Sequence, residues 1–104
     1  MPAPNRGEVW LADLGFAAKV RPCLVLSVPP DPQDRVLVTL VPHTTSVQGT
    51  RFEVAVPKPF LLAGAFDPQG LVTVALPRLL RKLGVLQPAE LTMIEDAVKR
   101  WLGL

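Results

Sequence analysis

The chain has 104 residues, 49% of them hydrophobic, and its formal net charge at pH 7 is +2. This length is too short for two folded domains, so we expect one domain spanning residues 1–104. No segment approaches the roughly 20 unbroken apolar residues of a membrane span, and the mean hydropathy of +0.33 is better explained by a subunit interface. The charge permits a polyanionic partner but is far below that of a dedicated duplex-binding protein.

The N-terminus and the cysteine content restrict location and redox chemistry. Residues 1–6 lack the apolar core of a signal peptide, so we expect the protein to stay in the cytoplasm. Cys23 is the only cysteine and lies within an apolar run. This excludes a disulfide framework and zinc-type spacing, and it favours a buried core thiol over a catalytic nucleophile.

The first half of the chain predicts three β-strands. Residues 8–12 follow Gly7 as a half-buried strand, and residues 22–28 form a near-continuous apolar one. Residues 29–34, rich in Pro and Asp, cannot form regular structure and lead to a third strand at residues 35–41.

The second half predicts further strands and a helix. Polar and apolar residues alternate at 51–56 as in a strand with one wet face, and Pro57 ends it. A stretch punctuated by Pro and Gly at 58–69 leads to a short strand at 70–75, and residues 83–86 are suited to a last one. Five or six short strands in this order predict a small, strongly bent antiparallel sheet or barrel.

A C-terminal amphipathic helix is expected to pack on this sheet. Pro88 suits the first helical position, and Gly103 can end the helix. Apolar residues recur between them at spacings of three, four and three: Leu91, Ile94, Val98 and Trp101. Trp10 and Trp101 are expected to be core or interface anchors rather than platforms for stacked bases.

Side chains suited to phosphate chemistry lie at the ends of two neighbouring predicted strands. Arg21 precedes the second strand, and the third is followed by the cluster His43, Thr44, Thr45 and Ser46. A guanidinium, an imidazole and hydroxyls can all bind one phosphate, which suggests RNA cleavage without a metal. No His and carboxylate pair has metal-ligand spacing and no Gly-rich phosphate loop is present, so we expect neither metal nor nucleotide cofactor.

Each of these residues also has a structural alternative. Arg21 can form a salt bridge with Asp13 or Glu53 at the strand entrance. Hydroxyls that follow a strand commonly form turn hydrogen bonds, and only the pairing with Arg21 favours a catalytic role for them. For His43, a structural role is at least as well supported as a catalytic one.

Three segments in order resemble the MazF/PemK family of toxin endoribonucleases. They are RGEVWLADL at residues 6–14, Arg21-Pro22 leading an apolar strand into Ser27, and VPHTTS at residues 41–46. The similarity continues through RLLRKLGVL at residues 78–86 and the final helix. It therefore covers nearly the whole chain.

The resemblance implies an SH3-like barrel of the MazF/PemK/CcdB type that forms a homodimer. It also implies metal-independent cleavage of single-stranded RNA at short sequences. The partner implied is an antitoxin, acidic and partly disordered, that lies across the RNA groove. Together with that antitoxin, the protein is expected to bind DNA. By position, Arg21 matches the catalytic arginine and Thr44 the catalytic threonine or serine, with Thr45 as the alternative. RNA contacts are expected from Lys19, Ser46 and Arg51. A proton shuttle by His43 is a hypothesis about this chain alone, based on its reference pKa near 6.5.

Two segments depart from the family pattern. Residues 15–20 are shorter than the Gly-rich loop that folds over RNA in many members, which bears on activity and sequence preference. The strand at 70–75 lacks the usual polar residues, so we expect an apolar dimer surface there. The alternative function is a non-catalytic toxin of the same fold that acts on a protein such as DNA gyrase, or binds only nucleic acid or antitoxin. The Arg21 and Thr44 pair favours the enzyme.

Overall fold

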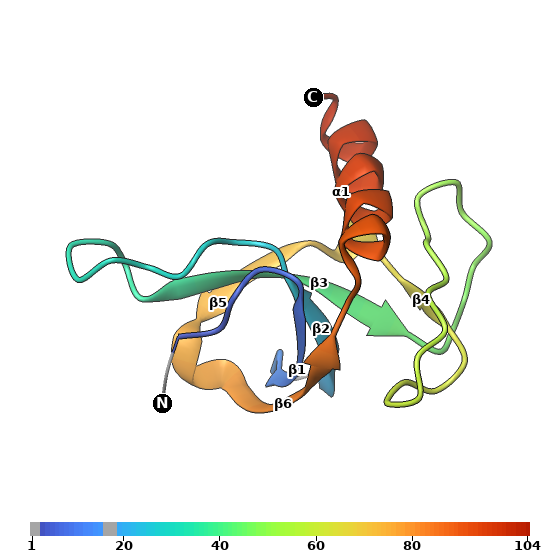
Figure 1. Ribbon diagram of the computed structural model, residues 1–104. Helices are drawn as coiled ribbons and strands as arrows, with labels where there is room; N and C mark the ends of the chain where they lie inside the picture. Colours follow the sequence, from blue (N-terminus) through green and yellow to red (C-terminus); the bar gives the residue numbers. More distant parts are fainter. Residues whose placement is uncertain (1–2, 16–18) are drawn as a thin grey trace.

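The computed structural model describes residues 3–15 and 19–104, and these form a mostly antiparallel β-sheet with a C-terminal helix (Figure 1). The strands are β1 Glu8–Asp13, β2 Val20–Val25, β3 Leu37–Thr44, β4 Ala65–Phe66, β5 Val72–Ala75 and β6 Leu79–Val85. Helix α1 is Pro88–Leu102, and two short 3-10 helices, η1 Pro68–Gly70 and η2 Leu76–Arg78, lie before and after β5. The predicted fold class is confirmed.

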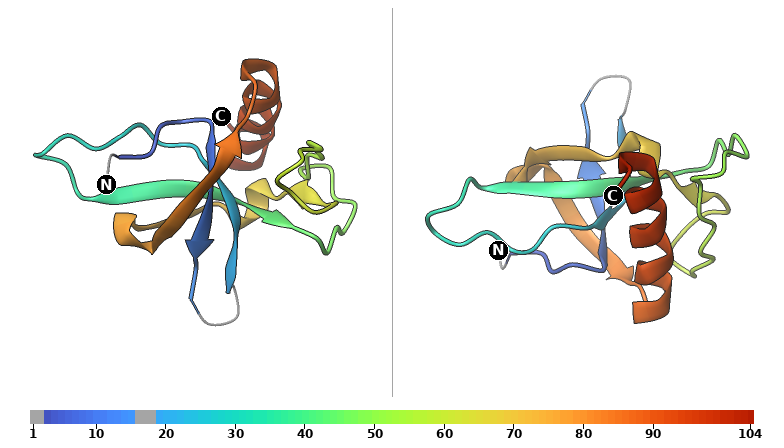
Figure 2. Two further views of the ribbon diagram at one scale, coloured as in Figure 1. Left: turned by 60° about the horizontal axis from the view of Figure 1, so that its bottom comes forward. Right: turned by 90° about the horizontal axis from the view of Figure 1, so that it is seen from above.

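Strand β3 (Leu37–Thr44) is the centre of the sheet. One edge pairs with β2, and the other pairs first with β5 and then with β4. β1 pairs with β2 on one side and with β6 on the other, so the order is β4-β3-β2-β1-β6 with β5 also on β3. Because β5 and β6 are consecutive in the chain yet lie on opposite sides of the sheet, the sheet curls strongly (Figure 2).

Both faces of the sheet are buried, which explains the near-continuous apolar character of the central strands. One cluster lies beneath α1 and includes Val9, Leu24, Val41, Ile94 and Val98. The neighbouring residues in the strands, among them Trp10, Cys23 and Leu40, face a second cluster on the other side. Alternate side chains of a strand point to opposite faces, so each central strand contributes to both clusters.

Helix α1 has the predicted bounds, and it begins with a capping box that was not predicted. Gln87 and Glu90 form a capping box, in which the Gln87 backbone N–H donates to Oε1 of Glu90 over 2.7 Å. Gly103 takes the left-handed conformation that ends the helix. Ile94 is fully buried, whereas Trp101 remains 44% exposed and presents its ring edge to Phe52 at a centroid distance of 5.4 Å.

The predicted strand at residues 51–56 is wrong. Only Val54 in this segment makes a β-bridge, to Phe66, and the two-residue strand β4 lies in the stretch that was expected to be a connection. Phe52 is buried, with its ring against Trp101, and Val56 is buried in the cluster beneath α1. The alternation of polar and apolar residues at 51–56 therefore arises from separate tertiary contacts and does not indicate a strand.

The other strands also differ in their bounds from those predicted, β1 and β5 by one or two residues and β2, β3 and β6 by more, and the shifts of β2 and β3 matter for the site. β2 begins at Val20 and ends at Val25, so Arg21 lies within the strand rather than before it. β3 extends to Thr44, three residues beyond the predicted end. β6 runs over residues 79–85, longer than the predicted 83–86. Residues 28–36 form an arm that projects from one end of β3, and residues 45–64 lie at the other end (Figures 1 and 2).

Cys23 and Trp10 are core residues, as expected. Cys23 is completely buried, and burial raises the pKa of its thiol to about 12, so the thiol is protonated at neutral pH and is a poor nucleophile. Trp10 is 8% exposed and its indole N–H donates to Oε1 of Glu8 over 3.0 Å. In the described part of the chain, no helix is long and apolar enough to cross a membrane.

Candidate functional site

The pairing of β2 with β3 brings the two halves of the predicted site together. Cys23 lies opposite Pro42, and Leu24 opposite Val41, in an antiparallel register. The pairing ends at Cys23 and Pro42; continued two residues further, the same register aligns Arg21 with Thr44. Sequence spacing alone did not fix this register, because it depends on how the arm of residues 28–36 connects the strands.

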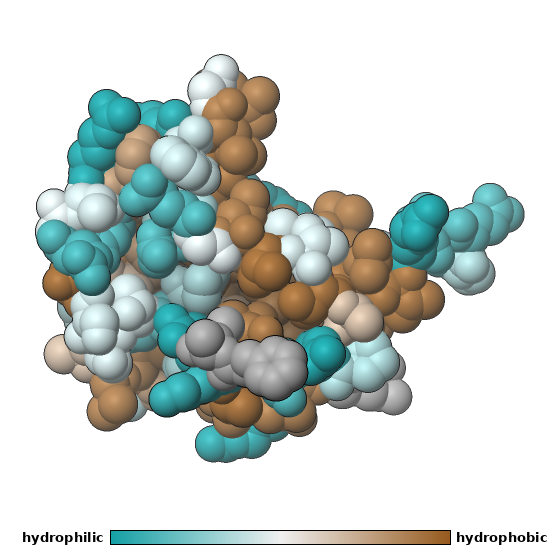
Figure 3. All heavy atoms as spheres, turned by 180° about the vertical axis from the view of Figure 1, so that it is seen from behind, coloured by the Kyte–Doolittle hydropathy of each residue, from teal (hydrophilic) through white to brown (hydrophobic). Residues whose placement is uncertain are grey.

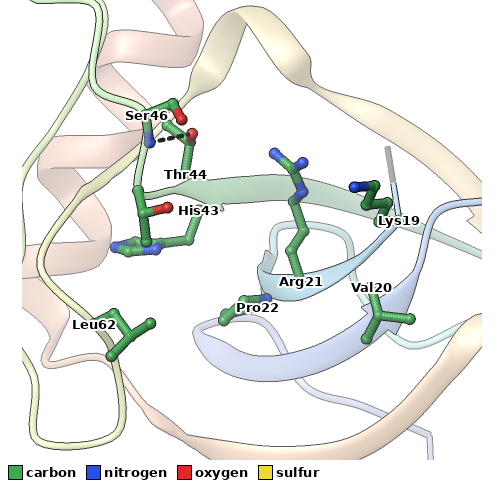
Figure 4. A pocket seen from close by; sticks show the side chains of 9 residues that line it. Lys19, Val20, Arg21, Pro22, His43, Thr44, Ser46 and Leu62 are labelled. Atoms are coloured by element: carbon green, nitrogen blue, oxygen red, sulfur yellow. Dashed lines mark hydrogen bonds between the residues drawn. The ribbon is translucent and has the colours of Figure 1, made fainter. Parts of the chain in front are cut away.

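Arg21 and Thr44 line one open cavity of about 290 Å³, which we call the central cavity. Figure 4 shows Arg21 rising from β2 with Lys19 on one side and Thr44 and Ser46 on the other. The full lining consists of Lys19, Val20, Arg21, Pro22, His43, Thr44, Thr45, Ser46 and Leu62. All predicted site residues except Arg51 are therefore brought to this one place.

The central cavity is suited to an anion. Its described lining residues include two cations, Lys19 and Arg21, and no carboxylate. The carboxylates considered as structural partners of Arg21 have other contacts. Asp13 accepts the backbone N–H of Gly15 over 2.9 Å and lies 3.9 Å from Arg78. Glu53 accepts the backbone N–H groups of Gln48 and Thr50, which lowers its pKa.

Lys19 is held at the rim in an unusual backbone conformation. Its φ of 58° lies in the left-handed region, which costs a residue with a side chain about 1 kcal/mol or more. Its backbone N–H donates to Gly15 over 2.6 Å, and its carbonyl accepts from Leu14 over 2.9 Å. These two hydrogen bonds close the β1–β2 connection and place the ammonium group beside the cavity. Residues 16–18 of the shortened loop lie outside the described residues.

The three hydroxyl residues differ in how well they are fixed. The hydroxyl oxygen of Thr44 accepts the backbone N–H of Ser46 over 3.0 Å (Figure 4), as the turn alternative anticipated. A hydroxyl has one hydrogen and two lone pairs, so this bond orients the side chain and leaves its hydrogen to donate elsewhere. Thr44 is half-buried, whereas Thr45 and Ser46 are exposed. The better-positioned donor is Thr44.

His43 is a buried residue in the wall of the cavity. It is 4% exposed and its ring packs edge-on against Phe66 at a centroid distance of 5.0 Å. Burial lowers the pKa of its imidazole below the usual 6.5, so the neutral form predominates at pH 7. In Figure 4 the ring extends from β3 on the side away from the Arg21 guanidinium.

Two residues of the site were not identified from the sequence, because both lie in residues 58–69, which were predicted to be a connection. Leu62 forms part of the cavity wall. Gly64 lies so close to β3 that a Cβ added there would be 2.1 Å from the carbonyl oxygen of Thr44 and 2.8 Å from Cε1 of His43. Only glycine permits this approach. The sequence signal that was available is Gly64 itself, one residue before the pair Ala65–Phe66 that forms β4.

Arg51 is not brought to the central cavity. Its guanidinium lies 4.6 Å from the centroid of the Phe52 ring, a cation–π contact on the exposed segment near α1. Among the residues that the structure describes, no three His, Cys, Asp or Glu side chains are grouped so that they would hold a metal ion.

Residues 5–102 match the family model described as a PemK-like, MazF-like toxin of a type II toxin-antitoxin system. Among solved structures, the chain is similar to an endoribonuclease in complex with its cognate antitoxin from a mycobacterial species, with 30% identity, a TM-score of 0.80 and coverage of 100% of this chain and 97% of that one. A second mycobacterial endoribonuclease has 29% identity and a TM-score of 0.81, with 100% and 95% covered. MazF from Deinococcus radiodurans shares the fold at 24% identity, with a TM-score of 0.83 and all of both chains covered. The chain therefore belongs to the PemK/MazF family of toxins of type II toxin-antitoxin systems.

Proposed function

We propose that this protein is a metal-independent endoribonuclease that cleaves single-stranded RNA at specific short sequences. The observation that carries the proposal is the central cavity, in which Lys19, Arg21 and the oriented hydroxyl of Thr44 gather without a carboxylate. The endoribonuclease neighbours of the same family support it.

The cavity residues suit attack by a ribose 2′-hydroxyl on the adjacent phosphate. The bond between O2′ and phosphorus forms, the bond from phosphorus to O5′ breaks, and a proton moves from O2′ to O5′ overall. Arg21 can hold two phosphate oxygens and stabilise the extra charge of the phosphorane, and Thr44 can donate its hydroxyl hydrogen to the same group. The expected products are a 2′,3′-cyclic phosphate and a 5′-hydroxyl.

The remaining requirement is a group that accepts a proton at neutral pH. A guanidinium has a pKa above about 12 and is a poor proton carrier. His43 is the candidate acceptor, because its lowered pKa keeps the imidazole neutral at pH 7; since its ring lies on the side away from the Arg21 guanidinium, the proton must reach it through a hydroxyl group or a water molecule. Its ring contacts Phe66 and lines the cavity. The same burial predicts a measurable effect on stability.

The His43→Gln variant is expected to resist mild acid better than the wild type. The pKa of His43 is lower in the folded protein than in the unfolded chain, so the unfolded chain binds more protons as the pH falls below about 6.5. Wild-type stability should therefore fall from pH 6.5 downward, and this loss should be smaller in the variant. Thermal unfolding at pH 5, 6 and 7 measures this loss of stability.

An unchanged rate of RNA cleavage by His43→Ala at pH 7 would exclude the proton-transfer role.

We further propose two protein partners, a second copy of this chain and an antitoxin. Large apolar residues are exposed in several places, including Val28, Val36, Leu37 and Leu80, and Figure 3 shows apolar residues over much of one face between α1 and the hydrophilic tip of the arm. Contiguous apolar surface of this kind is typical of interfaces. Several neighbours are complexes of MazE with MazF or of an endoribonuclease with its cognate antitoxin. Sedimentation as a monomer alone at micromolar concentration would contradict the homodimer.

The function is tested by incubating purified protein with a long single-stranded RNA in excess EDTA and mapping the product ends. We expect discrete cuts at a short recurring sequence, with cyclic-phosphate and 5′-hydroxyl ends. Cleavage that EDTA abolishes would contradict metal independence. Intact RNA with correctly folded protein would overturn the enzyme and favour a toxin of the same fold that only binds its target.

A further inference from the structure

Two further cavities share lining residues with the central cavity. The first, of about 260 Å³, shares Arg21 with it and is lined by Leu14, Arg21, Pro42, Asp67, Gly70 and Val72; we call it the Asp67 cavity. The second, of about 370 Å³, shares His43 and Leu62 with the central cavity. A nucleic acid strand whose phosphate lies at Arg21 would therefore find the Asp67 cavity next to that phosphate.

The Asp67 cavity differs chemically from the central one. Three of its walls are apolar, from Leu14, Pro42 and Val72, and its charged side chains are Asp67 and, where it meets the central cavity, Arg21. A carboxylate repels a phosphate, so with the phosphate held at Arg21 the part of the cavity beside Asp67 does not suit the sugar-phosphate backbone. Apolar walls with one hydrogen-bond acceptor suit a flat base that presents an N–H group.

The fold holds Asp67 in place at the start of η1. Its backbone N–H donates to the carbonyl of Pro42 in β3 over 2.8 Å, which ties it to the strand that carries Thr44. Its Oδ1 accepts the backbone N–H of Gln69 over 3.2 Å. One carboxylate oxygen is thus used to fix the side chain, and Oδ2 remains as the acceptor for a ligand.

Gly70 keeps the cavity open beside this second oxygen. A Cβ added at Gly70 would lie 3.0 Å from Cγ of Pro42 and 3.3 Å from Oδ2 of Asp67. Any side chain at this position would therefore crowd both the wall and the acceptor. The glycine leaves Oδ2 accessible to a group that enters the cavity.

We propose that Asp67 is a specificity-determining residue that reads the base of a nucleotide next to the scissile phosphate. The proposal rests on the proposed function, because it places the scissile phosphate at Arg21. An ionised carboxylate only accepts hydrogen bonds, so it favours bases with an exocyclic amino group, namely cytosine, adenine and guanine. Uracil has no amino group, and its single N3–H donor lies between two carbonyl oxygens, which a carboxylate repels. Asp67 should therefore select against uracil at one position of the cleavage sequence.

The test uses Asp67→Asn, which keeps the oxygen that caps Gln69 and replaces the second oxygen with an amide donor. RNA substrates carry each of the four bases at each position next to the cut. We expect the wild type to cleave the substrate with an amino-bearing base roughly tenfold faster, or more, than the uracil substrate at one position. In Asp67→Asn this ratio should fall close to one. Asp96→Asn is the matched control, since Asp96 is exposed on α1 and the substitution makes the same change of charge.

A second measurement separates this inference from the proposed function. The same oligonucleotides, made uncleavable by a 2′-deoxy sugar at the cut, are titrated against wild type, Asp67→Asn and Asp67→Ser; the serine variant keeps a capping oxygen but has no second one. Discrimination against uracil in binding that both variants lose supports the role of Asp67 even if cleavage is not seen. Cleavage with an unchanged preference in Asp67→Asn overturns it and leaves the proposed function standing. Failure of the wild type to bind or cleave any of these RNAs overturns both.

Discussion

Replacing Arg21 with alanine is expected to lower the rate of RNA cleavage by roughly 100- to 1000-fold, the usual cost of removing one pre-positioned charge-stabilising group. Arg21 lies within β2 and lines the central cavity together with Thr44. The cleavage rate on a defined single-stranded RNA in excess EDTA measures this effect. Circular dichroism of the same sample establishes that the variant is folded.

Two further substitutions of arginine test whether the position of the positive charge matters. Arg21→Lys keeps the positive charge but loses the planar pair of donors, so its rate should lie between those of wild type and Arg21→Ala. Arg100→Ala is the control, because Arg100 is an exposed cation on α1 outside the central cavity. Equal losses in Arg21→Ala and Arg100→Ala would mean that general charge, and not the position of Arg21, sustains cleavage.

The same assay separates the two candidate threonines. Thr44→Val should slow cleavage strongly because it removes the oriented hydroxyl, and Thr45→Val should have the smaller effect because Thr45 is exposed. The reverse order would assign the catalytic hydroxyl to Thr45. Valine has nearly the shape of threonine, so the comparison isolates the hydroxyl group.

Gly64→Ala is expected to destabilise the protein and to reduce cleavage together, although Gly64 carries no functional group. An added Cβ would lie 2.1 Å from the carbonyl oxygen of Thr44, which is backbone and cannot rotate away. The pairing of β3 with β4, in which Thr44 lies opposite Ala65, must then open. Overpacking of this kind costs about 1–3 kcal/mol, and the free energy of unfolding from urea titration measures it.

The neighbouring variant Ala63→Val provides the control for Gly64→Ala. Ala63 is exposed, so the two added methyl groups should change the free energy of unfolding by no more than about 0.5 kcal/mol. A Gly64→Ala protein as stable and as active as the wild type would show that β4 does not position Thr44.

Local patterns in the sequence determined much of the fold. The helix was predicted with both ends correct, because its signals, Pro88, the apolar spacing and Gly103, all lie within the helix or next to it. The strands β1 and β5 and the buried Cys23 also follow from local composition. The same local reading was wrong at residues 51–56, where the alternation of Phe52, Val54 and Val56 arises from contacts with α1, β4 and the core.

The sequence by itself determined which residues are suited to the site, since Arg21, His43 and the three hydroxyl residues follow from residue type and from the resemblance to the family. Only the tertiary structure decided how they are arranged. The pairing of β2 with β3 brings Arg21 and Thr44 to one cavity, and Gly64 lies close against the end of β3. The structure also shows that a backbone hydrogen bond to Pro42 holds Asp67 beside β3. These contacts join residues far apart in the chain, and their geometry depends on how the curled sheet packs, which no local pattern encodes.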